Sequence, residues 1–451
     1  MNRKHTAPDR ISYMLLSPHA PFAPSRCPFF YGWIILFVGA AGVLMSAPGQ
    51  TIGVSAFTDL LIRDLGISQT NLSLAYLLGT LASSFILSHA GRAYDRYGAR
   101  LMGTIVTVAL GGVLIGLSLI PELVGFLYDL FPGLRPVPTA FVLISLGFFM
   151  LRFSGQGVLS LVSRNMVLKW FELRRGLANA IVGVATTVGF SASPLIFNSM
   201  INQWGWQGTW RLLGVIIALP FACAFLLLAR DNPRECGLLP DGGMKLRRTS
   251  NAPEAYPSAD FTLRQSQKTL PFWVFLGIIA AASMYFTGLT FNIVSVFEEA
   301  GRTRTQAISI FLPSSIIALF LNLAAGWICD HIRIKYLVML QGIGILMSAI
   351  SIVLLNKPGM VSLLIIGNGI NSGMFGIVSA VPWPRFYGVT HLGRISGFVM
   401  GWSVAGSALG PYIFSLSLDL FGTYRLVSVL TAVGVAGLLL FSPFANRPEA
   451  P

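Results

Sequence analysis

Arg152 is the charged residue whose position most clearly suggests chemistry. It lies about halfway along the apolar residues 139–163, and an arginine at the centre of a membrane helix costs roughly 2.5–3.5 kcal/mol on insertion scales. Such a side chain should face a bundle interior or a wet cavity. Gln156 follows one helical turn later, on the same face. Arg152 therefore either binds an anion or relays a proton, or it ties helix ends together through backbone carbonyls and Gln156.

A second set of candidate residues is polar, uncharged and near the middle of apolar stretches. Their amides and hydroxyls would be costly against lipid, so most should face inward. Each either contacts a bound solute or holds neighbouring helices together. Tyr285 and Asn371 lie nearest the middle of their stretches. The other candidates for solute binding are Gln50, Tyr76, Asn292, Asn368 and Trp402.

Signatures of catalysis and of cofactor binding are missing. Gly401-Trp-Ser403-Val-Ala405 lacks the last glycine of a nucleophile elbow. Gly367-Asn-Gly369 lies inside an apolar stretch rather than after a strand, and neither HExxH nor a phosphate-binding loop occurs. The cysteines have neither disulfide nor metal-ligand spacing: Cys27, Cys223, Cys236 and Cys329. We expect no enzyme, no cofactor and no metal.

Composition indicates which elements must position these residues. Of 451 residues, 54% are hydrophobic and only 11% are charged, whereas a soluble domain has about 25% charged residues. Much of the outer surface must therefore face the lipid bilayer. The formal charge of +14 comes from scattered basic residues, which are typical of loops at anionic lipid headgroups and not of a nucleic-acid groove.

Twelve apolar segments are long enough to cross a bilayer, which requires about 20 residues each. The sequence predicts an all-α membrane protein with these spans: 29–52, 71–90, 101–120, 139–163, 176–200, 210–229, 271–297, 306–328, 336–355, 360–383, 394–416 and 425–443.

Basic residues predict the orientation and the domains. With both termini inside, the cytoplasmic segments hold 23 Lys and Arg residues against 7 in the outer loops, as the positive-inside rule requires. The polar stretch between spans six and seven reads as a linker. We expect a cytoplasmic tail (1–28), a six-helix bundle (29–229), a cytoplasmic linker (230–270), a second bundle (271–443) and a cytoplasmic tail (444–451).

The two halves carry related motifs, which indicates a duplicated six-helix unit. After span two comes Gly91-Arg-Ala-Tyr-Asp95-Arg96-Tyr-Gly98-Ala-Arg100. After span eight, Gly326, Asp330 and Lys335 repeat the glycine, the acid and the final cation at the same offsets.

The first of these motifs resembles the signature between helices two and three of the major facilitator superfamily. That resemblance implies two six-helix bundles around a central cavity, with substrate bound near the midplane between them. Glycines would let helix ends approach closely, and Asp95 would face a helix N-terminus or an arginine. The implied gating residues are Gly91, Asp95, Arg96, Gly98, Arg100, Arg174, Arg175, Asp330 and Arg394.

Further strings are similar to the monocarboxylate-porter and oxalate/formate-exchanger branch of that superfamily. These include Tyr31-Gly-Trp33, Trp170-Phe171 with Arg174-Arg175-Gly176, and Asn232-Pro233-Arg234. Some branch members hold a carboxylate with cations in spans one, eight and eleven. Here spans one and eight have no charge, and span eleven has only Arg394 at its mouth.

The resemblance implies a monomeric secondary transporter of a small organic anion, working by proton symport or by anion exchange in a bacterial inner membrane. Glu298 and Glu299 are either coupling groups or solvated charges facing Arg302 and Arg304. With no acid deep in a span, the substrate itself would carry a coupled proton. The alternatives are a facilitator or exporter of a neutral or amphiphilic solute, and a membrane sensor without net transport.

Overall fold

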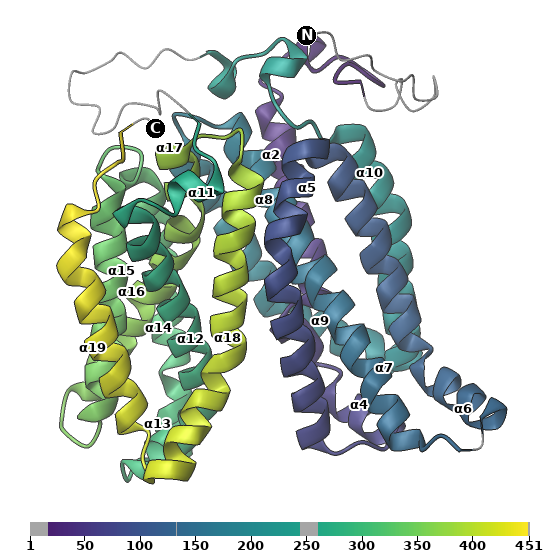
Figure 1. Cartoon of the computed structure of the whole chain (residues 1–451), viewed down its shortest axis with the longest axis vertical. Helices are drawn as coiled ribbons and strands as arrows, with labels where there is room; N and C mark the ends of the chain where they lie inside the picture. The colour runs from purple at the N-terminus through teal and green to yellow at the C-terminus, as the bar shows by residue number, and fades with distance from the viewer. Residues whose placement is uncertain (1–16, 132, 244–259, 450–451) are drawn as a thin grey trace.

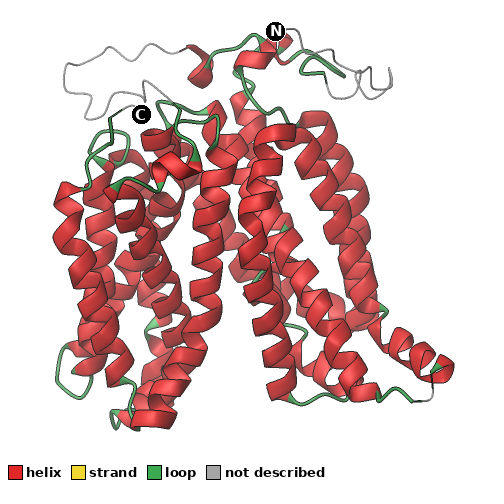
Figure 2. Ribbon diagram, viewed as in Figure 1, coloured by secondary structure: helices red, strands yellow, loops and turns green. Residues whose placement is uncertain are grey.

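Helices make up all the regular structure of the part of the chain that is described (Figure 2). The computed structural model describes residues 17–131, 133–243 and 260–449. Most of the expected N-terminal tail (1–16), part of the linker (244–259) and the last two residues lie outside the described residues. Within them, nine helical stretches are long and apolar enough to cross a membrane.

The helices divide between two halves of the chain. The first half contains α2 (Gly32–Met45), α3 (Thr51–Ser55), α4 (Thr58–Leu65), α5 (Gln69–Ser118), α6 (Ile120–Leu130), α7 (Pro136–Leu151), α8 (Ser160–Trp170), α9 (Arg175–Ile216) and α10 (Ala222–Leu228), with the π-helical segments η3 (Arg152–Leu159) and η4 (Ile217–Phe221). The second contains α11 (Leu263–Ser266), α12 (Leu270–Glu299), α13 (Arg304–Ser309), α14 (Phe311–Ile328), α15 (Ile334–Val353), α16 (Met360–Ala380), α17 (Pro382–Tyr387), α18 (Leu392–Phe421) and α19 (Arg425–Phe441). Short 3-10 turns are η1 (Pro24–Arg26), η2 (Ala47–Gly49), η5 (Arg234–Cys236), η6 (Pro240–Gly243) and η7 (Ser442–Phe444).

The twelve expected spans are all found in these helices. Spans two and three form α5, which bends at Gly98, and spans five and six run from α9 to α10 with a bend at Gly205. Both glycines have positive φ, +79° and +67°, which favours a residue without Cβ. Span one is interrupted after Met45 by η2. Apart from its first residue, Ile120, helix α6 lies outside the predicted spans.

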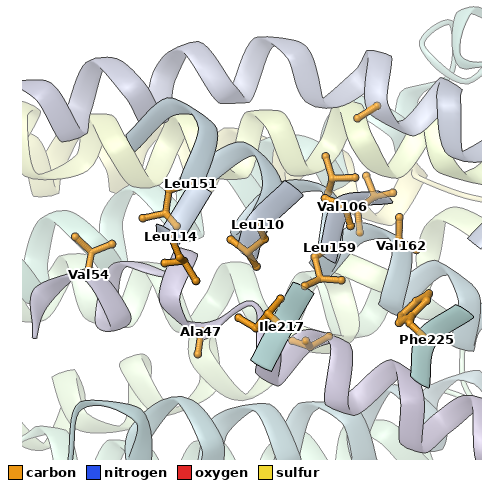
Figure 3. Close-up of a cluster of buried hydrophobic side chains, with 14 of the residues drawn as sticks. Ala47, Val54, Val106, Leu110, Leu114, Leu151, Leu159, Val162, Ile217 and Phe225 are labelled. Atoms are coloured by element: carbon orange, nitrogen blue, oxygen red, sulfur yellow. The ribbon is translucent and has the colours of Figure 1, made fainter. Parts of the chain in front are cut away.

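Each half has its own hydrophobic core, and the two halves stand side by side (Figure 1). Figure 3 shows part of the first core, where Leu110, Leu151, Leu159 and Ile217 from four segments converge. Large apolar side chains also lie on the outside: Phe85 is 76% exposed and Leu440 is 74% exposed. An apolar exterior around an apolar core is the pattern of a bundle solvated by lipid.

The halves meet where α5 runs beside α18 (Figure 1). Gly393, Gly397 and Gly401 recur at four-residue intervals along α18. A Cβ added at any of them would collide with a backbone carbonyl of α5, at Gly91, Leu87 and Ser84 respectively. Small residues of this kind let two membrane helices approach to backbone contact. The first and last described residues lie at the end of the molecule where α18 begins (Figure 1). We call this end the terminal face.

Candidate functional site

A cavity of about 510 Å³ lies between the two halves. Its walls come from α2, η3, α8 and α9 in the first half and from α12, α16 and α18 in the second. The polar side chains of its lining are Gln50, Gln156, Ser160, Arg164, Asn165, Thr187, Ser283, Thr287, Asn371, Ser372, Ser379, Ser396, Ser403 and Ser407. No Asp, Glu, His or Lys occurs among the lining residues. The cavity is therefore hydroxyl-rich, and a single guanidinium supplies its charge.

Arg164 is that cation, and it was not among the binding residues predicted from the sequence. Gln156, Ser160 and Arg164 lie at four-residue intervals and all line the cavity, because α8 continues the fourth span as far as Trp170. Among the described residues, Arg164 has neither a hydrogen bond nor an ion pair. A half-buried cation without a protein partner is costly to keep out of bulk water. The cavity is thus electrostatically prepared for an anion.

The wall that the second half contributes is built from hydroxyl pairs. Ser283 hydrogen bonds to Ser403 over 2.7 Å, and one turn along, Thr287 bonds to Ser407 over 3.0 Å. These pairs join α12 to α18 and leave oxygen lone pairs for a polar solute. Asn371 is buried, and its carboxamide oxygen accepts a bond from Gln341 over 3.3 Å.

Arg152 is not among the cavity-lining residues. It is 1% exposed, and its Nη1 donates to the carbonyl of Gly49 over 2.9 Å. Its guanidinium lies 5.0 Å from the centre of the Tyr76 ring, and the Tyr76 hydroxyl donates to Thr51 over 2.9 Å. Gly49 belongs to the interruption of span one, where carbonyls lack helical partners. Arg152 therefore bridges a break in the first span.

The other predicted binding residues lie in different surroundings. Gln50 lines the cavity, and its amide donates to Ser46 over 2.9 Å. Asn368 is buried beside the cavity and accepts a bond from Ser348 over 3.1 Å.

Three further candidates lie outside the cavity lining. Tyr285 is 1% exposed in the second core and hydrogen bonds to Ser428 over 3.2 Å. Asn292 donates to the Gly288 carbonyl of its own helix over 2.9 Å. Trp402 is 50% exposed, on the outside of the bundle.

Two carboxylates, Asp95 and Asp330, connect the halves at the terminal face, and each accepts hydrogen bonds from the other half. We call these two contacts the latches. Asp95 accepts hydrogen bonds from the backbone N–H groups of Gly393 (2.6 Å) and Arg394 (2.8 Å) at the start of α18. Asp330 accepts from Gly176 (3.0 Å) and Leu177 (3.3 Å) at the start of α9. Both carboxylates occupy helix N-termini, where unpaired N–H groups and the helix dipole favour an acceptor.

Asp330 has two further partners, the neighbouring Cys329 thiol, which donates to its carboxylate over 3.7 Å, and Arg385. Its carboxylate forms an ion pair of 3.4 Å with Arg385. Burial raises the pKa of Asp330 above its ordinary value, although the two amides and Arg385 act in the opposite direction.

The remaining predicted gating residues have varied surroundings. Arg96 and Arg174 are exposed, and the Arg96 guanidinium lies over the Tyr97 ring. Arg100 is buried and donates to the carbonyls of Leu226 and Ser17. The other two, Arg175 and Arg394, are buried and half-buried respectively, and Arg175 donates to the Leu168 carbonyl over 3.1 Å.

At the opposite end of the molecule, Glu299 holds the start of α19. Its carboxylate accepts from the hydroxyl of Thr423 and, over 2.8 Å, from the backbone N–H of Tyr424. Arg302, which one of the two interpretations placed opposite the glutamates, donates to the carbonyls of Leu355 and Lys357. Glu299 therefore has a structural partner rather than a place in the cavity.

Comparison with known proteins identifies a matching family and several similar transporters. A family model described as Major Facilitator Superfamily matches residues 39–411. The hexuronate transporter of Bacillus subtilis (strain 168) is 23% identical over 432 residues, which cover 91% of this chain and 93% of that protein. Monocarboxylate transporter 6 of Mus musculus is 29% identical over 218 residues, covering 47% of this chain and 42% of that protein.

Two more similarities concern part of the sequence and the fold. The probable L-galactonate transporter of Escherichia coli (strain K12) is 26% identical over 176 residues, covering 39% of this chain and 34% of that protein. The solved structure of the proton:xylose symporter XylE bound to 6-bromo-6-deoxy-D-glucose superposes with a TM-score of 0.61 at 17% identity, over 93% of this chain and 97% of that one. This likeness shows a shared fold.

Proposed function

Because the chain belongs to the major facilitator superfamily and is a transporter, we propose that it carries a small organic anion, a carboxylate, across the membrane by alternating access. The observation that carries this proposal is Arg164, a cation in the cavity between the halves that has no hydrogen-bond or ion-pair partner in the described part of the chain. A carboxylate would complete its hydrogen bonding, because guanidinium matches the geometry of two carboxylate oxygens. The names of the relatives, a hexuronate, a monocarboxylate and a probable galactonate transporter, support a carboxylate as cargo.

The charge of the cavity lining also favours one way of coupling substrate transport to a proton or to a second anion. With no acid or histidine among its lining residues, the cavity offers no side chain that binds a proton near neutral pH. A bound monoanion neutralises Arg164, whereas an empty cavity would have to close around an uncompensated cation. The loaded protein should therefore change conformation more readily than the empty one. This asymmetry favours anion exchange, or symport in which the proton travels on the substrate.

The conformation described here is closed at the terminal face. Asp95 and Asp330 latch the two halves there, and Asn165 donates to Ser396 of the other half over 2.6 Å at the cavity itself. The distribution of basic residues supports a cytoplasmic location for this face. We therefore take the structure as the outward-facing state of a protein of a bacterial inner membrane, with both termini in the cytoplasm.

The test is uptake and counterflow in proteoliposomes. The labelled panel contains formate, acetate, lactate, pyruvate, oxalate, gluconate and glucuronate, with and without an inward proton gradient. Three variants are compared with the natural chain: Arg164→Gln, Arg164→Lys, and as a matched control Arg135→Gln, which removes an exposed cation outside the cavity. We expect carboxylate flux that is lowered about tenfold or more in Arg164→Gln, since a charged hydrogen bond contributes about 1.5–3 kcal/mol.

The lysine variant should keep part of the flux, and the control all of it. Equal flux in Arg164→Gln would overturn the role of Arg164. Flux of uncharged compounds alone would identify a facilitator of neutral solutes, and binding without any flux would identify a sensor. Flux that is stimulated by the same anion on the opposite side and ignores the proton gradient would establish exchange.

A further inference from the structure

A smaller side chamber of about 190 Å³ adjoins the central cavity. It lies between α9, α12, α14 and α16. Thr187, Phe286 and Ser372 line both spaces, so these three residues form the boundary between them. Phe286 is 39% exposed, and its ring forms part of both walls. The central cavity and the chamber are therefore adjacent at Phe286.

The chamber is lined by polar side chains that can form hydrogen bonds, and none of them is charged. None of its lining residues is ionisable. The carboxamide oxygen of Asn322 is buried without a hydrogen-bond partner, while its Nδ2 donates to the Gly373 carbonyl over 3.3 Å. The hydroxyls of Ser315 and Ser372 also have no hydrogen bond among the described residues. The chamber thus holds one unused acceptor and two unused hydroxyls.

A buried polar atom without a partner is rare in folded proteins and calls for a ligand or water. The chamber volume is large enough for several heavy atoms and not just for one water molecule. Groups that both donate and accept would satisfy this lining, because Asn322 requires a donor and the serines can serve as either. Alcohol hydroxyls meet that requirement. A second carboxylate would find no cation here.

We infer that the side chamber is a subsite for the uncharged, hydroxylated end of the substrate. The inference rests on the proposed function, in which Arg164 holds the carboxylate end in the central cavity. Asn322 and Ser372 would then determine specificity: they distinguish a hydroxylated carboxylic acid from an aliphatic one of equal length. Phe286 would pack against the carbon chain where it passes from one space to the other.

The test compares two six-carbon monocarboxylates that differ in their hydroxyls. Binding of D-gluconate and of hexanoate to the purified full chain is measured by titration calorimetry. The variants are Ser372→Ala, Asn322→Leu and Arg164→Gln. The matched control is Ser351→Ala, which removes a buried hydroxyl that donates only to the Met347 carbonyl of its own helix over 2.6 Å. Thermal melting of each variant verifies that it is folded.

We expect the natural chain to bind gluconate more tightly than hexanoate by about tenfold or more. Ser372→Ala and Asn322→Leu should each weaken gluconate by roughly threefold to tenfold, the effect of one hydrogen bond, and leave hexanoate unchanged. The Ser351→Ala control should alter neither affinity. A purely structural role for Ser372 or Asn322 would change both ligands together and would not move their ratio.

The outcomes separate the two proposals. Loss of binding of both acids in Arg164→Gln supports the proposed function. If the ratio of gluconate to hexanoate affinity is then the same in all folded chamber variants, the subsite alone is refuted. If Arg164→Gln binds both acids normally, the proposed function fails first. A natural chain that prefers hexanoate, or that binds neither acid, refutes the subsite, while the proposed function is decided by the uptake panel above.

Discussion

Replacing Asp95 with alanine is expected to open the terminal face. The carboxylate of Asp95 accepts two backbone hydrogen bonds, from Gly393 at 2.6 Å and from Arg394 at 2.8 Å. Alanine leaves both N–H groups without an acceptor inside a closed interface. Loss of a side-chain cap costs about 0.5–2 kcal/mol, and an orphaned buried donor about 1–3 kcal/mol. A shift of about 2 kcal/mol lowers the ratio of closed to open molecules about 30-fold.

Cys329 provides the assay for this opening. Its side chain is 0% exposed, and it packs at Gly176 beside the second latch. A thiol in that position reacts with a water-soluble maleimide only when the two halves separate. The background for the measurement replaces the other three cysteines with serine: Cys27, Cys223 and Cys236. In it, Asp95→Ala should raise the rate at which Cys329 is labelled, by up to about 30-fold.

Two further variants make the experiment decisive. Asp95→Asn retains an acceptor oxygen and should stay within about threefold of the natural rate, since asparagine caps helices as well as aspartate does. Arg96→Ala removes an exposed neighbour that forms no hydrogen bond or ion pair to the described residues of the other half, and it should leave the rate unchanged. An unaltered rate in Asp95→Ala would refute the latch, and an equal rise in Arg96→Ala would show that the loop as a whole, and not the cap, closes the face.

Three other outcomes are expected. Arg152→Gln should lower the melting temperature because it removes the bond to Gly49, a charged hydrogen bond of about 1.5–3 kcal/mol; an unchanged melting temperature with lost transport would return Arg152 to substrate binding. Burial raises the pKa of Asp330, so the closed conformer binds this proton more tightly than the open one. The fraction of closed molecules should be largest below the ordinary aspartate pKa of about 3.9 and should fall as pH rises through the raised pKa of Asp330. Spin-label distances across the terminal face measure this fraction, and an equal pH response in Asp330→Asn would contradict the prediction. Gly91→Val should prevent closure because a Cβ there collides with the carbonyl of Gly393, and Cys329 labelling as slow as in the natural chain would disprove this.

The arrangement of the chain was largely predictable from its sequence. Long apolar runs predict spans, because each backbone polar group in lipid must be satisfied within a helix. The repeated pairs of glycine and aspartate predict two related halves. The structure extends this relation, since Asp95 and Asp330 hold equivalent helix starts in opposite halves. A charged motif at fixed spacing after an apolar run is a strong signal in a single sequence.

The rotation of each helix was not predictable to the same extent. Tyr285 and Trp402 both lie near the middle of their spans. Tyr285 is nevertheless buried in the core of the second half, and Trp402 is exposed on the outside. Core and lipid are both apolar, so hydropathy gives no direction around a helix of this kind. Arg152 and Gln156 do not share a face, since the intervening turn is π-helical and a π-helix places residues differently from an α-helix.

Arg164 was missed because the fourth span was predicted to end at residue 163, whereas the helix continues to Trp170. The signal was present in the sequence: continuing the face of Gln156 in four-residue intervals leads through Ser160 to Arg164. Helix ends are the least reliable part of a prediction from sequence, and here the error moved the cation of the cavity into a loop.

The two latches also bear on how such a molecule could originate. Each half lends a carboxylate to the other and receives one in return, so the interface is self-complementary in the manner of a twofold dimer. A six-helix ancestor that paired with its own copy would already have possessed both contacts at this face. Joining the copies through a linker would then convert a concentration-dependent association into an intramolecular one, without any new contact between the halves.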